Sequence, residues 1–398
     1  MKIKVGVFFG GKSVEHEVSV ISALQACAAF DKEKYEVIPV YITRENEFFA
    51  GEGVGRIEEY TDIKALLKKA TRVTLVNSDG RLKIVRFPMK KLGNSTLDMI
   101  DVAFPIVHGT NVEDGALQGF FQTLSVPYVG CDVVSSAVGM DKYVMKAVLK
   151  DNNIPVLDCV VLGAKDFSKD SSSCADKIEE KLGYPLIVKP INLGSSVGIK
   201  KANDRVSLLE ALDYAFQFSN KVLVEHAITA LKEINCSVCG DSDEAEASEC
   251  EEPISTDEIL SYQDKYVSGS KSGGTKQQGM SSLKRKIPAD ISAEKRSEIR
   301  EMAVRAFKCL GCSGVSRIDF MIDTESDRIY LNEINTIPGS LAFYLWEPIG
   351  VKYSELLDRM VSLSLKRERE TRNLSFSYET GILKNAKLGG AKGGKLHG

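Results

Sequence analysis

Short apolar runs alternate with polar, glycine-containing turns along the first third of the chain. Residues 3–9 are β-branched and aromatic, end at Gly10-Gly11, and are followed by apolar residues at helical spacing. A strand, a loop and a helix in this order are typical of α/β domains. The same criteria predict strands at 35–42, 72–76, 82–87 and 100–107 and a helix over 115–124. The pattern predicts an N-terminal α/β domain with a parallel sheet over residues 1–131.

Helical and extended patterns alternate again in the rest of the chain. The predicted elements are helices over 140–152, 205–216 and 299–310, a strand over 185–189, and a hairpin of strands 315–322 and 328–335. Gly311 stands where the third helix would end. The pattern therefore predicts at least one further domain of the α/β (α+β) class after the N-terminal domain.

The composition is that of an ordinary globular protein: 398 residues, 43% hydrophobic and 27% charged. This length predicts two or three domains. The 52 Lys and Arg and 55 Asp and Glu residues leave a net charge of -3, without the basic excess that favours nucleic acid or an anionic membrane. No apolar run reaches the length of a signal-peptide core or a membrane span. We expect a cytoplasmic protein that acts on small molecules, with neither nucleic acid nor membrane as partner.

Nine cysteines are scattered through apolar segments, which argues against a disulfide framework. Two Cys-x-x-Cys pairs, Cys236/Cys239 and Cys309/Cys312, leave a zinc site as an alternative. The strand and helix patterns around them favour buried free thiols.

Three polar segments are expected to lie outside the core. The acidic cluster over 241–252 lacks the spacing of a calcium loop, so we expect a solvated hairpin edge. Residues 260–282 include a run rich in Ser, Gly, Lys and Gln and predict a mobile loop. Residues 376–398 predict a disordered tail.

The strongest chemical candidate lies on the predicted C-terminal hairpin. Glu333 and Asn335 are two apart on a strand, so both point to one face, and the antiparallel partner strand can bring Asp319 beside them. Three oxygen donors suit Mg²⁺, which takes its remaining ligands from water and phosphate. The alternative is ordinary polarity on a half-exposed sheet.

A second candidate is the turn after Lys189, which contains Asn192, Gly194 and two serines before Gly198. Small residues let backbone N–H groups approach phosphate oxygens, and a lysine at the strand end neutralises them. Lys142 upstream strengthens this interpretation.

The segment Gly6–Ser13 satisfies the spacing of a phosphate-binding P-loop. Val7, Phe8 and Phe9 fit a strand better than a loop whose amides curl round a phosphate. A P-loop nucleotide-binding switch remains an alternative.

Taken together, these motifs resemble the D-alanine:D-alanine ligases of the ATP-grasp superfamily over nearly all of residues 3–365. The matching pieces are Gly10 to Ser19, His108 to Gly115 with Gln118-Gly119, Met140-Asp141-Lys142, Lys189 with its Gly-Ser-Ser-Val-Gly turn, Lys265-Tyr266, and Arg317 to Gly339. The resemblance implies two ATP-grasp subdomains, over 132–225 and 226–375. It also implies the ATP-dependent joining of two D-alanines through an acylphosphate, for peptidoglycan synthesis.

The resemblance assigns an ATP site and a metal site. The implied ATP-binding residues are Lys142, Lys189 and Lys265 at the phosphates, Ser196 in the turn, Glu225, Ala227 and Ile228 at the adenine, and Glu233 at the ribose. The chain has one residue more than the family pattern between Glu225 and Glu233. Asp319, Glu333 and Asn335 would hold Mg²⁺ or Mn²⁺, as two ions.

The resemblance also assigns the amino-acid sites. Glu15, Ser195 and Tyr266 would form a hydrogen-bonded set over the first D-alanine, and Arg317 with the Gly339 amide would form the oxyanion hole. Three further residues, His108, Glu113 and Ser340, would contact substrate. The tyrosine at 266 argues against D-lactate as acceptor.

One segment departs from the family pattern. Residues 340–346 read Ser-Leu-Ala-Phe-Tyr-Leu-Trp, where the family usually has a Thr-Ser-His-Ser-Leu type of segment whose serine holds the second substrate's carboxylate. A D-alanine:D-serine ligase therefore stays an alternative, as does a catalytically silent ATP-grasp protein. The family pattern also allows a homodimer.

Overall fold

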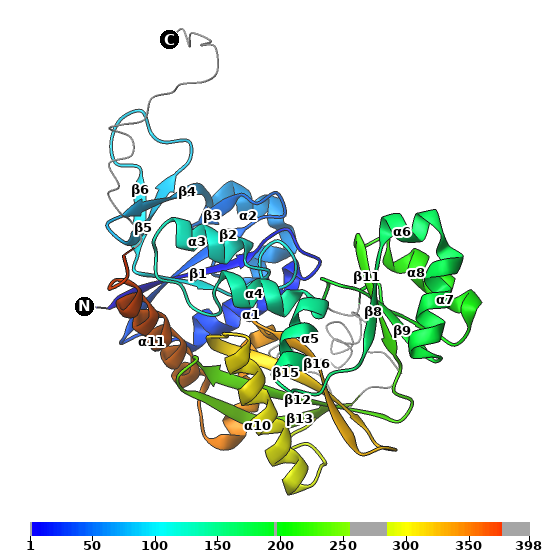
Figure 1. The fold of residues 1–398 in the computed structure, drawn as a ribbon. Helices are drawn as coiled ribbons and strands as arrows, with labels where there is room; N and C mark the ends of the chain where they lie inside the picture. Colours follow the sequence, from blue (N-terminus) through cyan, green and yellow to red (C-terminus); the bar gives the residue numbers. More distant parts are fainter. Residues whose placement is uncertain (1, 195–196, 255–284, 376–398) are drawn as a thin grey trace, which may run out of the picture.

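Three β-sheets carry the fold in the computed structural model, which describes residues 2–194, 197–254 and 285–375 (Figure 1). The first sheet has seven strands, the second four and the third five. The mixed α/β class predicted from the sequence is confirmed. The predicted limits at 131 and 225 stay predictions.

The seven-stranded sheet has the order β6-β5-β4-β3-β2-β1-β7. Its elements are β1 (Ile3–Gly10), α1 (His16–Ala29), β2 (Tyr35–Ile42), β3 (Phe48–Ala50), η1 (Ile57–Asp62), α2 (Ile63–Lys69), β4 (Thr71–Ser78), β5 (Arg81–Arg86), β6 (Thr96–Ile100), β7 (Val102–Pro105) and α3 (Ala116–Thr123). Only β2, β1 and β7 are parallel, and the other pairs are antiparallel. The predicted parallel sheet is thus the part around β1.

The prediction of a single strand over 100–107 is wrong, because the strand is interrupted at Asp101. Its N–H donates to the Lys4 carbonyl oxygen and its carboxylate accepts the Lys4 N–H, both at 2.8 Å. β6 therefore pairs with β5, whereas β7 pairs with β1. One residue joins strands at opposite ends of the sheet order, so the sheet curls back on itself.

The P-loop alternative is also wrong. Gly6 to Gly10 belong to β1, which pairs with β2 and β7, and Val7, Phe8 and Phe9 are completely buried. A strand buried on both faces cannot wrap its amides round a phosphate.

The four-stranded sheet has the order β10-β9-β11-β8 and lies beside α6, α7 and α8 at the right of Figure 1. The elements of this part of the chain are α4 (Val133–Met140), α5 (Lys142–Asp151), β8 (Cys159–Gly163), α6 (Ala164–Lys169), α7 (Ser171–Leu182), β9 (Leu186–Pro190), β10 (Lys200–Ala202), α8 (Arg205–Ala215) and β11 (Lys221–His226). Leu208 and Leu212 of α8 pack with Val188 of β9 in one core. An Asp204 capping box begins α8.

The five-stranded sheet is antiparallel, in the order β14-β13-β12-β15-β16. The elements are β12 (Leu231–Gly240), β13 (Ala245–Pro253), β14 (Arg285–Lys286), α10 (Ala293–Cys309), β15 (Gly314–Asp323), β16 (Arg328–Asn335), η4 (Gly339–Leu345), η5 (Glu347–Ile349) and α11 (Tyr353–Thr371). Ile299 and Phe307 of α10 pack with Ile318 and Leu331 of this sheet. The predicted C-terminal hairpin is confirmed as β15 and β16.

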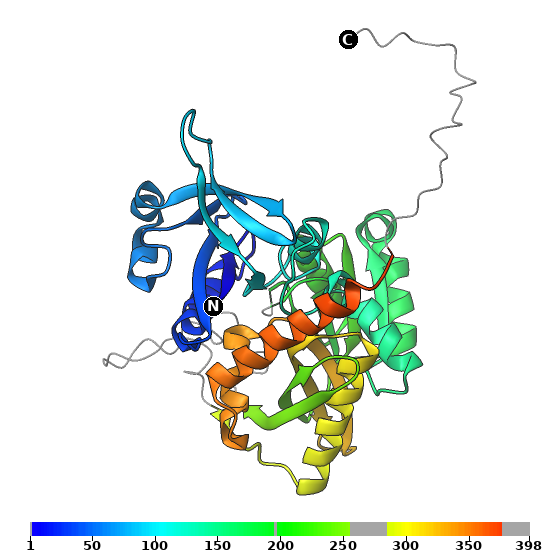
Figure 2. The same cartoon turned by 90° about the vertical axis from the view of Figure 1, so that its left-hand side faces the viewer.

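The last elements of the chain return to the first sheet. Trp346 is completely buried, and it shares one hydrophobic core with Phe104 of β7 and with Leu357 and Val361 of α11. Figure 2 shows α11 crossing the molecule next to the N-terminal elements. The N-terminal sheet therefore depends on residues 337–361 for part of its core.

The remaining expectations have mixed outcomes. The acidic cluster does lie on a hairpin, formed by β12 and β13. The prediction that all of its residues are solvated is wrong for Glu251, which is buried and forms an ion pair of 2.8 Å with Arg285.

All nine cysteines are free. The predicted loop 260–282 and the predicted tail 376–398 both lie wholly outside the described residues. Of the helices in the described ranges, none combines the length and apolar character that a bilayer crossing requires.

Candidate active site

A small cavity of about 50 Å³, here called the interface cavity, lies where the N-terminal loops meet β15, β16 and α5. Eight residues predicted from the sequence to be functional line it: Glu15, His108, Glu113, Lys142, Arg317, Glu333, Asn335 and Gly339. They come from segments more than 300 residues apart along the chain. The fold brings them together, and their individual roles stay predictions.

Lys142 is positioned by the start of α5. The Asp141 carboxylate accepts the N–H groups of Tyr143 and Val144 at 3.0 Å, which caps the helix. The buried Lys142 ammonium donates to the Leu193 carbonyl oxygen at 2.7 Å and lies 3.5 Å from a Glu333 oxygen. This lysine therefore joins the turn after Lys189 to the predicted metal ligands.

The predicted metal ligands meet through the register of β15 and β16. Asp319 lies opposite Glu333, and Arg317 lies opposite Asn335. The Arg317 guanidinium donates to both Asp319 oxygens at 2.7 Å, and the Asn335 side-chain amide donates to one of them at 3.1 Å. Burial lowers the pKa of Arg317, but the Asp319 carboxylate outweighs this and raises it well above its usual value.

This donor set fits a divalent cation. Two carboxylates and an amide share one sheet face, next to a lysine that can neutralise phosphate. Hard cations such as Mg²⁺ prefer such oxygen donors and complete their shell with water and substrate. Asp319, Glu333 and Asn335 could therefore hold the metal that the sequence predicts.

Glu15 reaches the same cavity from the loop before α1. A Cβ atom on Gly109 would lie 2.7 Å from a Glu15 oxygen and 2.4 Å from the Ser13 hydroxyl, and Gly109 has φ +82°. Only glycine meets both conditions without displacing Glu15. A Cβ atom on Gly194 would lie 3.1 Å from the same Glu15 oxygen, so the turn after Lys189 also approaches this carboxylate.

His108 is held at both ring nitrogens. Its Nδ1 lies 2.8 Å from the Ile337 carbonyl oxygen and its Nε2 lies 3.0 Å from the Ser22 hydroxyl. A carbonyl oxygen can only accept, so Nδ1 carries the proton and the Ser22 hydroxyl donates to Nε2. Burial lowers the pKa of His108 to about 4, so the ring is neutral at pH 7.

Ser22 is a residue that the sequence analysis missed. Besides contacting His108, its hydroxyl oxygen accepts the Ser340 N–H at 2.9 Å. It therefore links α1 to the start of η4. The sequence shows only a serine among the apolar residues of a helix. This pattern does not distinguish a serine that hydrogen-bonds distant segments from a serine that only packs in the interior.

Glu113 ties the loop after β7 to the segment after β16. Its carboxylate accepts the N–H groups of Gly109 and Ile337, both at 2.9 Å. Complete burial, and secondarily the negative charge of Glu15, raise the pKa of Glu113 to about 8. The group is therefore poised between its two protonation states near neutral pH.

The segment that departs from the family pattern has an unusual backbone. Ser340, Leu341 and Ala342 have φ of 52°, 53° and 50°, a left-handed conformation that costs about 1–2 kcal/mol per residue. The Ser340 hydroxyl donates to the Gln25 side chain at 2.7 Å. Gly339 lines the interface cavity, whereas Ser340 is not among the described residues that do so. Its predicted contact with substrate stays a prediction.

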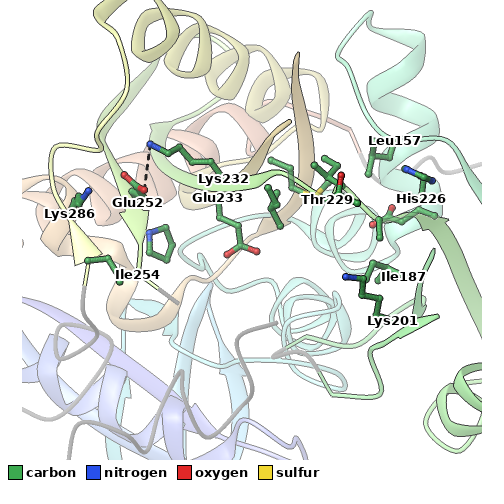
Figure 3. A pocket seen from close by; sticks show the side chains of 16 residues that line it. Leu157, Ile187, Lys201, His226, Thr229, Lys232, Glu233, Glu252, Ile254 and Lys286 are labelled. Carbon is green, nitrogen blue, oxygen red and sulfur yellow. Dashed lines mark ion pairs between the residues drawn. The ribbon is translucent and has the colours of Figure 1, made fainter. Parts of the chain in front are cut away.

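A larger cavity of about 480 Å³, here called the intersheet cavity, lies between the four-stranded and five-stranded sheets (Figure 3). It contains Glu225, Ala227, Ile228 and Glu233, the four residues matched to adenine and ribose. Figure 3 shows the side chains of Glu233 and Lys201 pointing into the same space. Lys232 and Glu252 form an ion pair of 3.5 Å at its edge.

A buried charge cluster surrounds Glu225, which lines the intersheet cavity. The Lys189 ammonium donates to one Glu225 oxygen at 2.5 Å, and the Lys146 ammonium lies 2.9 Å from the other. Burial raises the pKa of Glu225, but the two lysines outweigh it and hold the pKa at about 2. Glu225 is therefore ionised, and Lys146 is a second residue that the sequence analysis missed.

Four predicted site residues cannot be placed. Ser195, Ser196, Lys265 and Tyr266 lie outside the described residues. Their assigned roles remain expectations from the sequence.

Comparisons with known proteins agree along most of the chain. The model for the D-ala D-ala ligase N-terminus matches residues 4–131, and the model for the C-terminus matches residues 148–362. A D-alanine--D-alanine ligase of Thermosipho melanesiensis is 38% identical over 96% of this chain and 98% of its own length. One of Acetivibrio thermocellus is 39% identical over 92% of this chain and 96% of its own.

Solved structures give the same result. The D-alanine-D-alanine ligase from Coxiella burnetii aligns with a TM-score of 0.75 and 28% identity, covering 94% of this chain and 98% of its own. The VanG D-Ala:D-Ser ligase from Enterococcus faecalis aligns with a TM-score of 0.75 and 31% identity, covering 92% and 100%. On these matches and on the site described above, the chain belongs to the D-alanine–D-alanine ligase family.

Proposed function

We propose that this protein is an ADP-forming ligase that uses ATP to join two D-alanines into D-alanyl-D-alanine for peptidoglycan synthesis, in the cytoplasm. The observation that carries the proposal is the interface cavity, which is lined by Glu15, Lys142, Arg317 and Gly339 together with Glu333 and Asn335, two of the three predicted metal ligands. The full-length relatives named D-alanine--D-alanine ligase support D-alanine as acceptor. A homodimer stays a prediction.

In the proposed first step, the carboxylate of D-alanine attacks the terminal phosphate of ATP, which forms the acylphosphate and releases ADP. Phosphoryl transfer depends mainly on positioning and on neutralising charge. Lys142 and Lys189 would hold the phosphates, and Glu15 would bind the ammonium group of the first D-alanine. A divalent cation held by Asp319, Glu333 and Asn335 would supply further positive charge at the phosphates.

In the second step, the amine of the second D-alanine would attack the carbonyl carbon of the acylphosphate, forming the peptide bond and releasing inorganic phosphate. The Arg317 guanidinium and the Gly339 amide would stabilise the oxyanion that forms at the carbonyl carbon. His108 cannot act as an acid at neutral pH because its neutral ring is bonded at both nitrogens. Its role here would be to position the segment after β16.

The proposal is tested with the full chain, ATP, Mg²⁺ and D-alanine, by measuring ADP release and identifying the product by mass spectrometry. The expected product is D-alanyl-D-alanine, with activity lost on chelation and restored by Mg²⁺. A parallel reaction with D-alanine and D-serine measures the alternative, and a D-alanyl-D-serine product in excess would replace the D-alanine assignment. Absence of any dipeptide would refute the ligase.

Matched variants separate the metal site from general damage. Asp319→Asn should abolish Mg²⁺-dependent turnover, because it removes one of two carboxylate ligands. Asp323→Asn, near the end of the same strand, should leave turnover unchanged, since Asp323 only caps the turn through Ser326 and Glu325. Equal losses in the two variants would contradict the metal assignment.

A further inference from the structure

Lys146 is the most buried charged side chain near the proposed ATP site, and no role in the proposed reaction has been assigned to it. It stands four residues after Lys142 on α5, so both lysines project from one helix face. Lys142 contacts the five-stranded sheet through Glu333, whereas Lys146 contacts the four-stranded sheet through Glu225. One helix therefore reaches both sheets that enclose the intersheet cavity.

The contacts of Lys146 are few and specific. Its ammonium lies 2.9 Å from a Glu225 oxygen and donates to the Leu157 carbonyl oxygen at 3.2 Å. The other Glu225 oxygen accepts from Lys189, which also donates to the Asn332 side chain at 3.3 Å. Glu225 is thus shared between two ammonium groups.

The charges of this cluster do not cancel. Lys146, Glu225 and Lys189 are at most 4% exposed, so solvent screens them little. Two ammonium groups and one carboxylate leave a net charge of +1. Without Lys146, the carboxylate and Lys189 would form a neutral pair. A neutral pair attracts a phosphate much less than a group with net positive charge.

We propose that Lys146 is a positioning residue for the nucleotide: by neutralising one side of Glu225, it leaves the Lys189 ammonium with positive charge available to the phosphates of ATP. The inference rests on the proposed role of Lys189 at those phosphates. Glu225 fixes the place of the Lys189 ammonium, and Lys146 sets the charge of the pair. A lysine that only joins α5 to β11 would affect stability and leave phosphate recognition unchanged.

The test compares the binding of ADP with that of adenosine to the full chain, by calorimetry and without amino acid. Lys146→Met should weaken ADP binding about tenfold, equivalent to about 1.4 kcal/mol, and leave adenosine binding within about twofold. Lys150→Met, one turn further along α5 on an exposed ion pair with Asp158, should change neither. Equal weakening of ADP and adenosine by Lys146→Met would overturn the proposal.

A double variant tests the charge directly. Lys146→Met with Glu225→Gln returns the cluster to +1, so the ADP-to-adenosine affinity ratio should recover to within about threefold of the wild type. A ratio as low as in Lys146→Met alone would overturn the proposal. If Lys146→Met fails to fold, Lys146→Arg provides a second test. Because arginine keeps the positive charge, this variant should keep the ADP-to-adenosine affinity ratio of the wild type even if its melting temperature falls.

Failure of the proposed function is visible separately. It would appear in the wild type, as absent ADP binding or absent dipeptide. Failure of the Lys146 proposal would appear only in the variants, with a wild type that binds ADP and makes product.

Discussion

The two cavities of this protein are built in opposite ways. Side chains of the interface cavity bond mainly to one another and to backbone: Arg317 to Asp319, His108 to Ile337 and Ser22, Glu113 to two N–H groups. The intersheet cavity is about ten times larger, and the side chains of Lys201 and Glu233 point into it. The first resembles a preorganised reaction site, and the second a site shaped for a large, partly solvated ligand.

This difference has a physical reason. Groups that stabilise developing charge are effective when they are fixed before the reaction and shielded from water. A nucleotide base and ribose mainly require shape and a few directional contacts. Variants in the interface cavity should therefore change turnover or stability, whereas variants in the intersheet cavity should change nucleotide affinity.

After the loss of turnover expected for Asp319→Asn, the largest effect is expected for Arg317→Ala. Loss of an oxyanion-hole donor typically lowers kcat by about 10²–10³. ADP affinity, measured by calorimetry, should stay within about threefold, since Arg317 does not line the intersheet cavity in the described residues. Arg328→Ala, at the exposed start of β16, is the control and should keep full activity. A parallel loss of ADP binding and kcat would remove the distinction between the cavities.

Glu113→Gln should lower the free energy of unfolding by about 1–3 kcal/mol at pH 5, because an amide cannot accept both backbone N–H groups. The folded pKa of Glu113, about 8, is raised above its ordinary 4.5. Its contribution to stability is therefore present below pH 4.5 and is lost as the pH rises towards 8. The penalty of the variant should shrink between pH 5 and pH 8.5.

Denaturant unfolding at both pH values measures this shift. Glu325→Gln, on the exposed turn between β15 and β16, should show no pH-dependent difference from the wild type. A penalty for Glu113→Gln that stays the same at both pH values would mean that the carboxyl group is ionised throughout and would contradict the raised pKa.

Ser22→Ala should cost about 1 kcal/mol through two lost hydrogen bonds, and should raise the KM for the acceptor D-alanine about fivefold. The reason is that Ser22 joins His108 to the first residue of η4. Ser364→Ala is a matched control, because Ser364 is buried in α11 and its hydroxyl has no hydrogen-bond partner in the described part of the chain. Equal KM values in both variants would assign Ser22 a packing role only.

The smallest effect is expected for Glu233→Gln. If Glu233 contacts the ribose, the KM for ATP should rise about threefold, the size of one weakened hydrogen bond, with kcat unchanged. Glu252→Gln, across the same cavity and paired with Lys232, should leave the KM for ATP unchanged. A change in the KM for D-alanine, with the KM for ATP unchanged, would contradict the assignment of Glu233 to the ribose.

Periodicity predicted much of the fold, and motif spacing with the family resemblance named eight residues that the fold brings together at the interface cavity. β1, β2, β15 and β16 were predictable because each is an uninterrupted strand pattern with a turn at its end. The helices α2, α4, α6, α7 and α11 were missed, and α10 begins at Ala293 rather than 299. The first turns of α10 are charged, so apolar spacing alone could not locate its start.

Within the site, local patterns placed Glu333 and Asn335 on one face and suggested that Asp319 lies beside them, as the structure has it. No local pattern indicated that Lys146 shares Glu225 with Lys189, because these residues come from three elements. No local pattern indicated that Glu251 is buried either, because its partner Arg285 is 34 residues away along the chain.

The sequence by itself determined which residues are candidates to bind metal, phosphate and substrate, and it determined most of the strands and turns that carry them, because side-chain chemistry and short-range periodicity are local properties. The tertiary structure alone decided the protonation state of Glu113 and His108, the net charge around Glu225 and the left-handed turn at Ser340. Those properties depend on burial and on partners from distant segments, and both arise only when the three sheets pack together.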